Sequence, residues 1–380
     1  MGIYVEEHEI FRDSLKKFIE NEIVPNIDEW EEIRDIPRSI WKKMGELGFL
    51  CPWVEEQYGG SGVGFEYSSI IIYELARTGI GLGIASHNDI IIPYVADFGN
   101  HEQKLKWLPG CTTGNIIGSI AMSEPNAGSD LKAIQTTAIK DGDHYIVNGQ
   151  KTFITNGYVT DLAIVACKTD PHVNPPTKGI SLLAIERDTP GFSIGRKLNK
   201  VGLHTETTSE LIFEDCRVPV ANLLGEEGKA FTYMMSELQR ERLVCVIWAQ
   251  GMAERILDDV VEYCKVREAF GQPIGNFQHN AFKLAEMSTD VEMGKVFLDR
   301  LLEEYIGGIN IVDRVSMAKW WIPEMANRVA YHALQLHGGY GYIEEYPIAR
   351  FFRDVRGQTL YGGTTEVMKM IIARNMGFKA

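Results

Sequence analysis

The spacing of apolar residues changes twice along the 380-residue chain, and these changes constrain the fold more than any other feature. From about residue 6 to residue 115, apolar residues recur at helical spacing, as Leu15, Phe18 and Ile19 illustrate. The spacing then alternates, as in β-strands, from about residue 117 to residue 225. Helical spacing returns and continues to the end of the chain. The sequence therefore predicts a mostly α fold with a central β-domain.

The predicted elements divide into three domains: an N-terminal helical domain over residues 1–116, a middle antiparallel β-domain over 117–226, and a C-terminal helical domain over 227–380. In the first domain, the helix that begins at Glu102 is expected to end at Pro109-Gly110. In the last domain, long helices joined by short loops indicate an antiparallel bundle. These helices are predicted over 231–263, 277–305, 313–336 and 365–375.

Turn signals divide the middle domain into short strands. Asp141-Gly142 and Asn148-Gly149 are dipeptides that favour hairpin turns. Further strands are predicted over 163–166, 181–185 and 210–213. No GxGxxG motif follows a strand and there is no P-loop motif, so a dinucleotide-binding Rossmann domain has little support.

The composition excludes several classes of partner and site. The chain carries 38 basic and 52 acidic residues, and this net charge of -14 argues against a nucleic-acid or anionic-membrane partner. Six scattered cysteines form no CxxC pair, which indicates free thiols in a reducing compartment. No set of His, Cys and carboxylates has metal-ligand spacing, so no metal site is expected.

No targeting or membrane segment is predicted. The residues that follow Met1 lack a basic stretch ahead of an apolar run, so no signal or transit peptide is visible and a cytoplasmic location is expected. The most apolar region, residues 69–98, is interrupted by Glu74, Arg77 and Asp89. That pattern is typical of buried helices and not of a membrane span.

A glycine pair near the C-terminus precedes a predicted helix. Gly362 and Gly363 stand directly before Thr364, Thr365 and Glu366. Threonine is a good N-cap, and a glutamate in the first turn suits the positive end of the helix dipole. The loop is therefore either a ligand-facing turn with free N–H groups or an ordinary turn before a capped helix.

Two stretches of the middle domain offer polar groups at strand ends. Residues 121–130 contain small and hydroxyl side chains that can donate to a polar ligand, or they form a plain polar loop. Phe153 and Thr155 lie two apart and hence on one face of a strand. Such a pair can stack on a flat ring and donate to its edge nitrogen. The alternative is a strand with one buried phenylalanine.

The C-terminal domain holds three more candidate stretches. The charged run of residues 239–243 lies within a helix, where exposed charges are the ordinary case. Arg267 lies at a helix end followed by a turn, and with Gln278 it offers donors to a pyrophosphate or carboxylate. Residues 335–341 end a helix in a glycine-rich loop whose backbone can approach a ligand; helix capping explains both features equally well.

Taken in order, the motifs resemble those of the acyl-CoA dehydrogenase family of flavoproteins over essentially the whole chain. The resemblance implies a helical domain, a middle β-barrel-like domain and a C-terminal four-helix bundle, assembled as a homotetramer. The motifs that carry it are Met122-Ser123-Glu124-Pro125, Ala127-Gly128-Ser129-Asp130, Asn148-Gly149-Gln150-Lys151, Ile154-Thr155-Asn156-Gly157, Phe213-Glu214-Asp215, Val218-Pro219, Arg267-Glu268-Ala269-Phe270-Gly271 and Gly338-Gly339.

The resemblance also implies roles for single residues. FAD is expected between the middle domain and the bundle, partly across a subunit interface, with the Thr155 hydroxyl near the hydride-accepting nitrogen. The implied FAD contacts are Met122, Ser123, Phe153, Thr155, Arg267, Phe270, Gln278, Gln335, Gly338, Gly339, Thr364 and Glu366. The implied contacts of the acyl-CoA thioester are Ser129, Leu238, Arg242, Tyr361 and Gly363.

One departure from the family pattern concerns the catalytic base. Many members carry a glutamate directly after the tyrosine of the C-terminal loop, where this chain has Gly362. The long-chain branch resembles this chain, because it has a glycine there and carries its base on a bundle helix, just before an arginine. Glu241-Arg242 matches that helix position. The resemblance therefore implies that Glu241 is the base.

The chemistry explains how the base can move. The α-proton of a thioester is weakly acidic, so its removal needs a positioned carboxylate and donors for the enolate oxygen. Gly362 keeps its backbone N–H for that oxygen, while burial should raise the pKa of Glu241. The β-hydrogen would leave as hydride to FAD, giving a trans-2-enoyl-CoA.

The expected substrate is a saturated medium- or long-chain fatty acyl-CoA, and the expected electron acceptor is an electron-transfer flavoprotein. The alternatives are a branched short-chain substrate such as isovaleryl-CoA, a flavin oxidase or monooxygenase on the same fold, and a non-catalytic acyl-CoA-binding relative.

Overall fold

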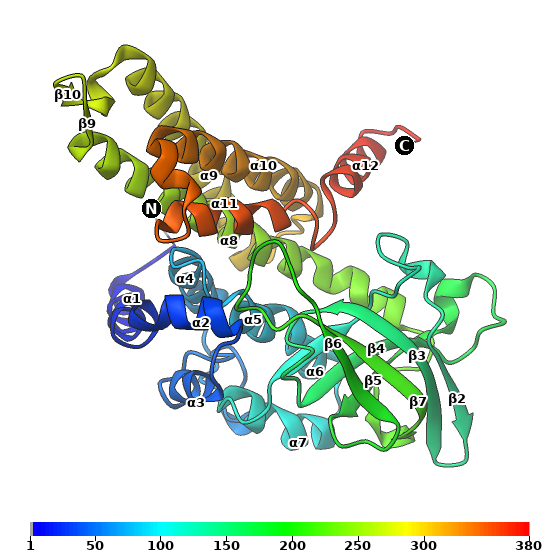
Figure 1. Ribbon diagram of the computed structural model, residues 1–380. Helices are drawn as coiled ribbons and strands as arrows, with labels where there is room; N and C mark the ends of the chain where they lie inside the picture. Colours follow the sequence, from blue (N-terminus) through cyan, green and yellow to red (C-terminus); the bar gives the residue numbers. More distant parts are fainter. Residues whose placement is uncertain (1–2, 380) are drawn as a thin grey trace.

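The computed structural model describes residues 3–379 as an N-terminal helical region, a middle β-sheet region and a C-terminal helical region (Figure 1). This order confirms the fold class expected from the two changes in apolar spacing. Within the described residues, no helix combines the length and the apolar character needed to cross a membrane.

The N-terminal region consists of short helices. One prediction is wrong here: α7 continues through Pro109 to Thr112, because Trp107, Leu108 and Cys111 are all buried and packing outweighs the proline's lost hydrogen bond. The elements are α1 Glu6–Phe18, η1 Ile19–Ile23, η2 Val24–Asn26, α2 Ile27–Ile33, α3 Arg38–Glu46, η3 Glu56–Tyr58, α4 Phe65–Ala76, α5 Leu82–Ser86, η4 His87–Ile91, α6 Pro93–Phe98 and α7 His101–Thr112.

The middle region is one sheet with strand order β6-β7-β3-β2-β4-β5-β8, and β1 pairs with β4. Its two faces are buried against separate apolar clusters, one of which includes helices α6 and α7. The elements are β1 Gly118–Ala121, η5 Leu131–Ala133, β2 Thr137–Asp141, β3 His144–Ile154, β4 Leu162–Lys168, η6 Pro176–Gly179, β5 Ile180–Glu186, β6 Phe192–Lys197, β7 Ser209–Pro219, η7 Val220–Asn222 and β8 Leu223–Leu224.

The predicted turns of the sheet had different outcomes. Asp141-Gly142 is a hairpin turn between β2 and β3, as expected. Asn148-Gly149 is not a turn but lies inside β3, where the register against β7 shifts between Val147 and Gly149. A β-carbon on Gly149 would lie 2.5 Å from the hydroxyl oxygen of Thr136, the residue before β2, so the glycine permits a close approach between β3 and that segment. The sheet is also not purely antiparallel, because β1 and β4 run parallel.

The C-terminal region is built around the 37-residue helix α8. The sequence prediction missed α11, although Ile348, Phe351 and Val355 are buried at helical spacing behind Pro347 in its first turn. The elements are α8 Ala230–Val266, β9 Glu268–Ala269, β10 Gln272–Pro273, η8 Ile274–Asn276, α9 Gln278–Ile306, α10 Val312–His337, η9 Gly338–Tyr342, α11 Pro347–Gly357 and α12 Thr365–Asn375.

Helix α8 joins the three regions. It packs on α4 of the N-terminal region, on α9 and α10 of the bundle, and on β5 of the sheet. Every residue from Glu241 to Ala253 is buried, so this part of the helix is surrounded by protein on all sides. Figure 1 shows α8 running from the bundle toward the sheet, and the Tyr94–Glu241 hydrogen bond joins this helix to α6 of the N-terminal region.

Candidate active site

Glu241 of α8 and Gly362 of the loop between α11 and α12 lie close together in the fold. Cys245, one turn after Glu241 on the same helix face, connects them: a β-carbon on Gly362 would lie 2.8 Å from its sulfur. Glu241 is only 8% exposed and Arg242 is equally buried, which overturns the reading of this run as ordinary surface charges. The helix glutamate and the loop glycine that the sequence paired thus face one region.

Burial controls the proton affinity of Glu241. It raises the pKa of this carboxyl to about 7, while a hydrogen bond from Tyr94 and the charge of Arg242 act in the opposite direction. This agrees with the expected effect of an apolar surrounding. A carboxyl that titrates near neutrality is suited to accept a proton from carbon and to release it afterwards.

Arg242 has a buried hydrogen-bond donor that no described residue uses. Its Nη1 donates to the Ser316 hydroxyl over 3.4 Å, and its buried Nε has no partner among the described residues. Burial also lowers the pKa of this guanidinium. An unfilled buried donor beside Glu241 fits the thioester contact that the sequence implied for Arg242.

The loop that carries Gly362 is tied to α10 by Lys319. The buried Lys319 ammonium donates to the carbonyl oxygens of Gln358, at 2.8 Å, and Gly363, at 3.2 Å. At the end of the loop, the Thr364 hydroxyl accepts from the Val367 N–H, which confirms the predicted N-cap of α12. No described residue accepts a hydrogen bond from the Gly362 N–H, so this donor is available to a ligand.

Glu366 lies in the first turn of α12, as predicted, and it is exposed. A hydrogen bond from its own backbone N–H and one from Thr364 lower the pKa of its carboxyl. The carboxylate is therefore charged at neutral pH, at the positive end of the helix.

Met122 and Ser123 follow the end of β1 and are held by main-chain contacts. The Ser123 carbonyl accepts from the Thr152 N–H at 3.0 Å. The fully buried Lys151 donates to the Met122 carbonyl at 3.1 Å and to the Glu124 carboxylate at 2.8 Å. These contacts hold the backbone of Met122 and Ser123, and both residues remain partly exposed.

Phe153 and Thr155 lie near the end of β3, but the geometric argument made from sequence does not apply to them. Phe153 has a positive φ of 60°, the ladder to β7 is shifted between Lys151 and Ile154, and Thr155 already belongs to the following turn. Simple strand alternation is therefore interrupted. Phe153 is 71% exposed, which contradicts the alternative of a buried phenylalanine and leaves its ring open to a planar ligand.

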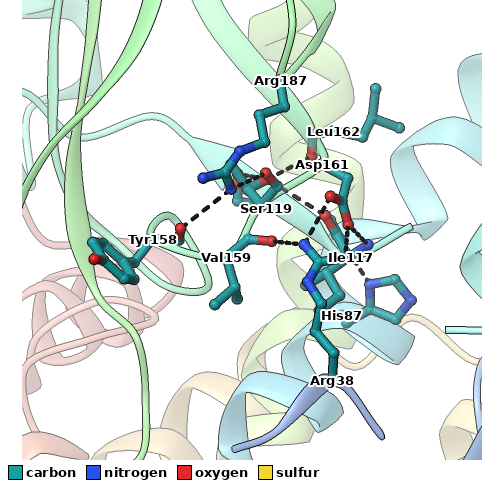
Figure 2. Close-up of polar contacts among 11 residues, drawn as sticks. Arg38, His87, Ile117, Ser119, Tyr158, Val159, Asp161, Leu162 and Arg187 are labelled. Carbon is teal, nitrogen blue, oxygen red and sulfur yellow. Dashed lines mark hydrogen bonds and ion pairs between the residues drawn. The ribbon is translucent and has the colours of Figure 1, made fainter. Parts of the chain in front are cut away.

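The turn after Thr155 is anchored by two arginines and an aspartate (Figure 2). Arg38 of α3 binds both oxygens of Asp161, which also accepts from the Ile117 N–H at 2.8 Å. Arg187 donates to two carbonyls of the same turn. The turn is thereby fixed between β1 and the N-terminal helices. The carbonyls held by Arg38 and Arg187 belong to Tyr158, Val159 and Thr160.

His87 in the same network is neutral. Its Nδ1 accepts from the Gly118 N–H at 3.0 Å, so the proton lies on Nε2, which donates to the Cys111 carbonyl at 3.2 Å. Burial lowers the pKa of His87 to about 4. The start of β1, and hence the Met122-Ser123 segment at its other end, is thus supported by an uncharged imidazole.

The other implied FAD contacts lie at the opposite end of α8, by β9 and β10 (Figure 1). From Glu241 to Val266 the helix rises about 38 Å. Here the Arg267 guanidinium lies 5.4 Å from the Tyr340 ring centre, which joins the ends of α8 and α10. The site residues at this end are Arg267, Phe270, Gln278, Gln335, Gly338 and Gly339.

The implied thioester contacts lie in three places: on α8, in the loop that carries Gly362, and in the segment between β1 and η5. Leu238 lies one turn before it on α8 and is half-buried. Gly363, with a φ of 96°, has its carbonyl taken by Lys319, and the Tyr361 hydroxyl is buried without a partner. Ser129 is exposed and forms no hydrogen bond with another described residue. Among these implied contacts, Tyr361 and Gly363 flank Gly362 in the loop, and Leu238 lies on the same helix as Glu241.

Two features fit a bound flavin nucleotide. Phe153 and Phe270 are large, exposed aromatic side chains, and Phe270 is 97% exposed. A β-carbon on Gly338 or Gly339 would meet no atom within 4 Å, so the backbone there is open to a ligand. Metal chemistry has no comparable support: among residues 3–379, no group of three or more His, Cys, Asp or Glu side chains has an arrangement that could hold an ion.

Sequence reasoning missed three residues that shape the site: Tyr94, Cys245 and Lys319. Two of them carried a readable signal. Cys245 is four residues after Glu241 and hence on the same helix face. Lys319 lies four residues after the buried Val315 and three before the buried Ile322, so its ammonium interrupts an apolar face. Tyr94 carried no signal, because its contact spans 147 positions in sequence.

Comparison with known proteins finds relatives that match nearly the whole chain. Long-chain specific acyl-CoA dehydrogenase from Sus scrofa is 43% identical over 376 residues, which are 98% of this chain and 87% of that protein. Isovaleryl-CoA dehydrogenase from Pongo abelii is 38% identical over 374 residues, which are 97% of this chain and 88% of that protein. The crystal structure of an acyl-CoA dehydrogenase from Geobacillus kaustophilus matches with a TM-score of 0.98 and 57% identity, and the match covers 100% of both chains.

Models of all three acyl-CoA dehydrogenase domains match the chain. The N-terminal domain matches residues 5–115, the middle domain 119–216 and the C-terminal domain 228–377. Members of this family are FAD flavoproteins that act on acyl-CoA. The chain therefore belongs to the acyl-CoA dehydrogenase family of FAD-dependent oxidoreductases.

Proposed function

We propose that this protein oxidises saturated medium- or long-chain fatty acyl-CoA to trans-2-enoyl-CoA, with Glu241 as the base. The observation that carries the proposal is the buried Glu241 carboxyl, with a pKa of about 7, beside a loop glycine whose N–H is free. In the reaction, the α-carbon loses a proton to Glu241, the β-carbon loses a hydride, and a C=C bond forms between them.

The site residues have different roles in proton removal. Glu241 takes the α-proton, and the Gly362 N–H stabilises the negative charge that develops on the thioester oxygen. Arg242, Leu238, Ser129, Tyr361 and Gly363 hold the substrate. Lys319 keeps the loop in place, because its two hydrogen bonds to carbonyls fix the peptide units around Gly362.

FAD, when bound, supplies the hydride acceptor. We propose that Met122, Ser123, Phe153, Thr155, Thr364 and Glu366 contact it from one copy of the chain. The opposite-end residues Arg267, Phe270, Gln278, Gln335, Gly338 and Gly339 would contact it from a second copy, since they lie about 38 Å away along α8. A homotetramer and an electron-transfer flavoprotein as electron acceptor complete the proposal. Domain limits near residues 116 and 226 and a cytoplasmic location remain predictions.

The chain length of the substrate is proposed from the relatives. The long-chain enzyme from Sus scrofa is more similar to this chain than the isovaleryl-CoA enzyme from Pongo abelii, at 43% against 38% identity. The margin is small, so oxidation of isovaleryl-CoA is the second candidate. It rests on that relative and requires the same base.

The test is flavin bleaching under anaerobic conditions with a series of straight-chain acyl-CoAs and with isovaleryl-CoA. We expect the fastest bleaching with a medium or long straight chain; fastest bleaching with isovaleryl-CoA would favour the second candidate. Peroxide formation in air would indicate an oxidase. Glu241→Gln should retain FAD and lose bleaching, whereas Glu262→Gln, at an exposed glutamate of the same helix, should bleach normally. Normal bleaching by Glu241→Gln would refute the assigned base.

A further inference from the structure

We propose that Tyr94 positions the Glu241 carboxylate for proton abstraction, through a hydrogen bond from its phenol to one carboxylate oxygen. This inference rests on the proposed function and adds a residue of the N-terminal region to it. Because the phenol stabilises the charged form of the base, removing it should move the pH at which the enzyme becomes active.

The hydrogen bond between Tyr94 and Glu241 is short and buried, and it engages one of the two carboxylate oxygens. The Tyr94 hydroxyl donates to Glu241 Oε1 at 2.8 Å, and Tyr94 itself has no exposed surface. Among the described residues, none donates a hydrogen bond to the second oxygen, Oε2. One oxygen is thus held in place, and the other remains available to take a proton.

Toward the ionised Glu241 carboxylate, the phenol acts as the donor. Burial, and next the nearby charge of Glu241, raise the pKa of Tyr94 well above its usual value, so it stays protonated at any pH at which the enzyme would work. A hydrogen bond to the charged form of an acid stabilises that form. Tyr94 therefore offsets part of the burial that makes Glu241 a weak acid.

Other charged and titratable groups surround Glu241, but they act at longer range. Arg242 favours the carboxylate through its charge, and Glu237, one turn earlier on α8, disfavours it. Cys245 is next along the same face, and Lys319 of α10 lies beyond it. Tyr94 is the group that makes a direct hydrogen bond with the carboxylate within residues 3–379.

The element that carries Tyr94 is fixed against α8. Arg240, the neighbour of Glu241, forms an ion pair of 2.6 Å with the buried Asp89 of η4, and its guanidinium lies 4.4 Å from the Trp53 ring centre. η4 is a π-helical turn, a feature often found at functional sites, and Pro93 then starts α6. Arg240 and Glu241, which are adjacent on α8, thus contact η4 and α6, which are adjacent in the chain. These two contacts hold the Tyr94 phenol close to the Glu241 carboxylate.

The test compares the pH profile of bleaching in FAD-loaded wild type and Tyr94→Phe. The variant should bind FAD normally and need a pH about one unit higher for half of its maximal bleaching rate, with recovery above that pH. A purely packing role would lower activity equally at every pH. Tyr58→Phe removes a phenol that contacts His101 in the N-terminal region, and it should keep the wild-type profile.

A second substitution keeps the shape of the side chain and tests the opposite direction. Tyr94→3-fluorotyrosine makes the phenol more acidic and thus a stronger donor, so the profile should move to lower pH. If both Tyr94 variants bind FAD and keep the wild-type profile while Glu241→Gln is inactive, the role of Tyr94 is refuted and the base assignment stands. If Glu241→Gln bleaches normally, the proposed function itself fails.

Discussion

A β-carbon on Gly362 would lie 2.8 Å from the sulfur of Cys245, so a side chain at this loop position would force the Cys245 thiol of α8 to move. The backbone adds a second restriction, because Gly362 has a φ of 63°, which side chains of L-residues disfavour. A glutamate cannot be accommodated in the loop without moving α8 or trimming Cys245. The glycine in the loop and the base that we propose on α8 are therefore compatible parts of one packing arrangement.

This arrangement predicts energetic coupling between Gly362 and Cys245. Gly362→Ala should lower the free energy of unfolding by about 2 kcal/mol or more, from the overlap and from the backbone conformation. Cys245→Ala removes the overlapping sulfur, so the double variant should be destabilised by less than the sum of the two single changes. Urea unfolding of all four proteins measures this cycle. If the two single changes in unfolding free energy add up to that of the double variant, there is no steric overlap between the side chains at positions 362 and 245.

Glu241→Gln should stabilise the protein at alkaline pH while abolishing activity. The folded carboxyl has a pKa of about 7 and the unfolded carboxyl about 4.5. Stability is therefore lost as pH rises between these values. Above pH 7 the loss amounts to about 3 kcal/mol, which glutamine does not incur. Unfolding at pH 8 and at pH 4.5 should show a gain at the higher pH and little at the lower. If the variant and wild type differ equally in their free energy of unfolding at both pH values, the raised pKa of Glu241 is contradicted.

His87 should make the protein sensitive to acid. Its pKa is about 4 in the folded chain against 6.5 when unfolded, so the unfolded chain binds this proton first. The stability present above pH 6.5 is then lost as pH falls, by about 2 kcal/mol at pH 5. His87→Asn keeps an acceptor for Gly118 but does not titrate. Unfolding curves at pH 7 and pH 5 should show a smaller change for the variant than for wild type; parallel losses would exclude His87 as the cause.

Lys319→Met should affect catalysis more than folding. The change removes a buried charge but releases the carbonyls of Gln358 and Gly363, so the loop around Gly362 loses its fixed geometry. Displacement of the Gly362 N–H, which we propose binds the thioester oxygen, should lower kcat on the order of 10²-fold. Lys369→Met, at an exposed lysine of α12, is the matched control and should bleach at the wild-type rate. A wild-type kcat in Lys319→Met would remove Lys319 from the mechanism.

The periodic features of the sequence predicted the large elements well. The change from helical to alternating spacing and back corresponds to the three regions, and α12 begins at Thr365 behind its threonine cap as expected. Local rules failed where tertiary contacts decided the outcome. Asn148-Gly149 became a bulge because β7 and Thr136 approach there, and Pro109 stayed inside α7 because its neighbours are buried.

The candidate site also divides into residues that local motifs indicated and residues that only tertiary contacts bring in. The proposed roles of Glu241 and Gly362 came from the resemblance to the long-chain branch, which rests on motifs that are local in sequence. The phenol of Tyr94 could not be found this way, since it meets Glu241 only after η4 and α6 have packed on α8. The carboxyl's altered pKa depends on that packing as well, so its direction was predictable but its partner was not.

The separation of the implied flavin contacts to opposite ends of α8 has a consequence for how the cofactor is retained. In the proposed assembly, each flavin draws its ligands from two polypeptides, so binding obeys mass action in protein as well as in FAD. Dilution that separates the copies would remove half of the ligands at once. The yellow colour of the protein and its quaternary state should then disappear together, at a protein concentration that added FAD shifts downward.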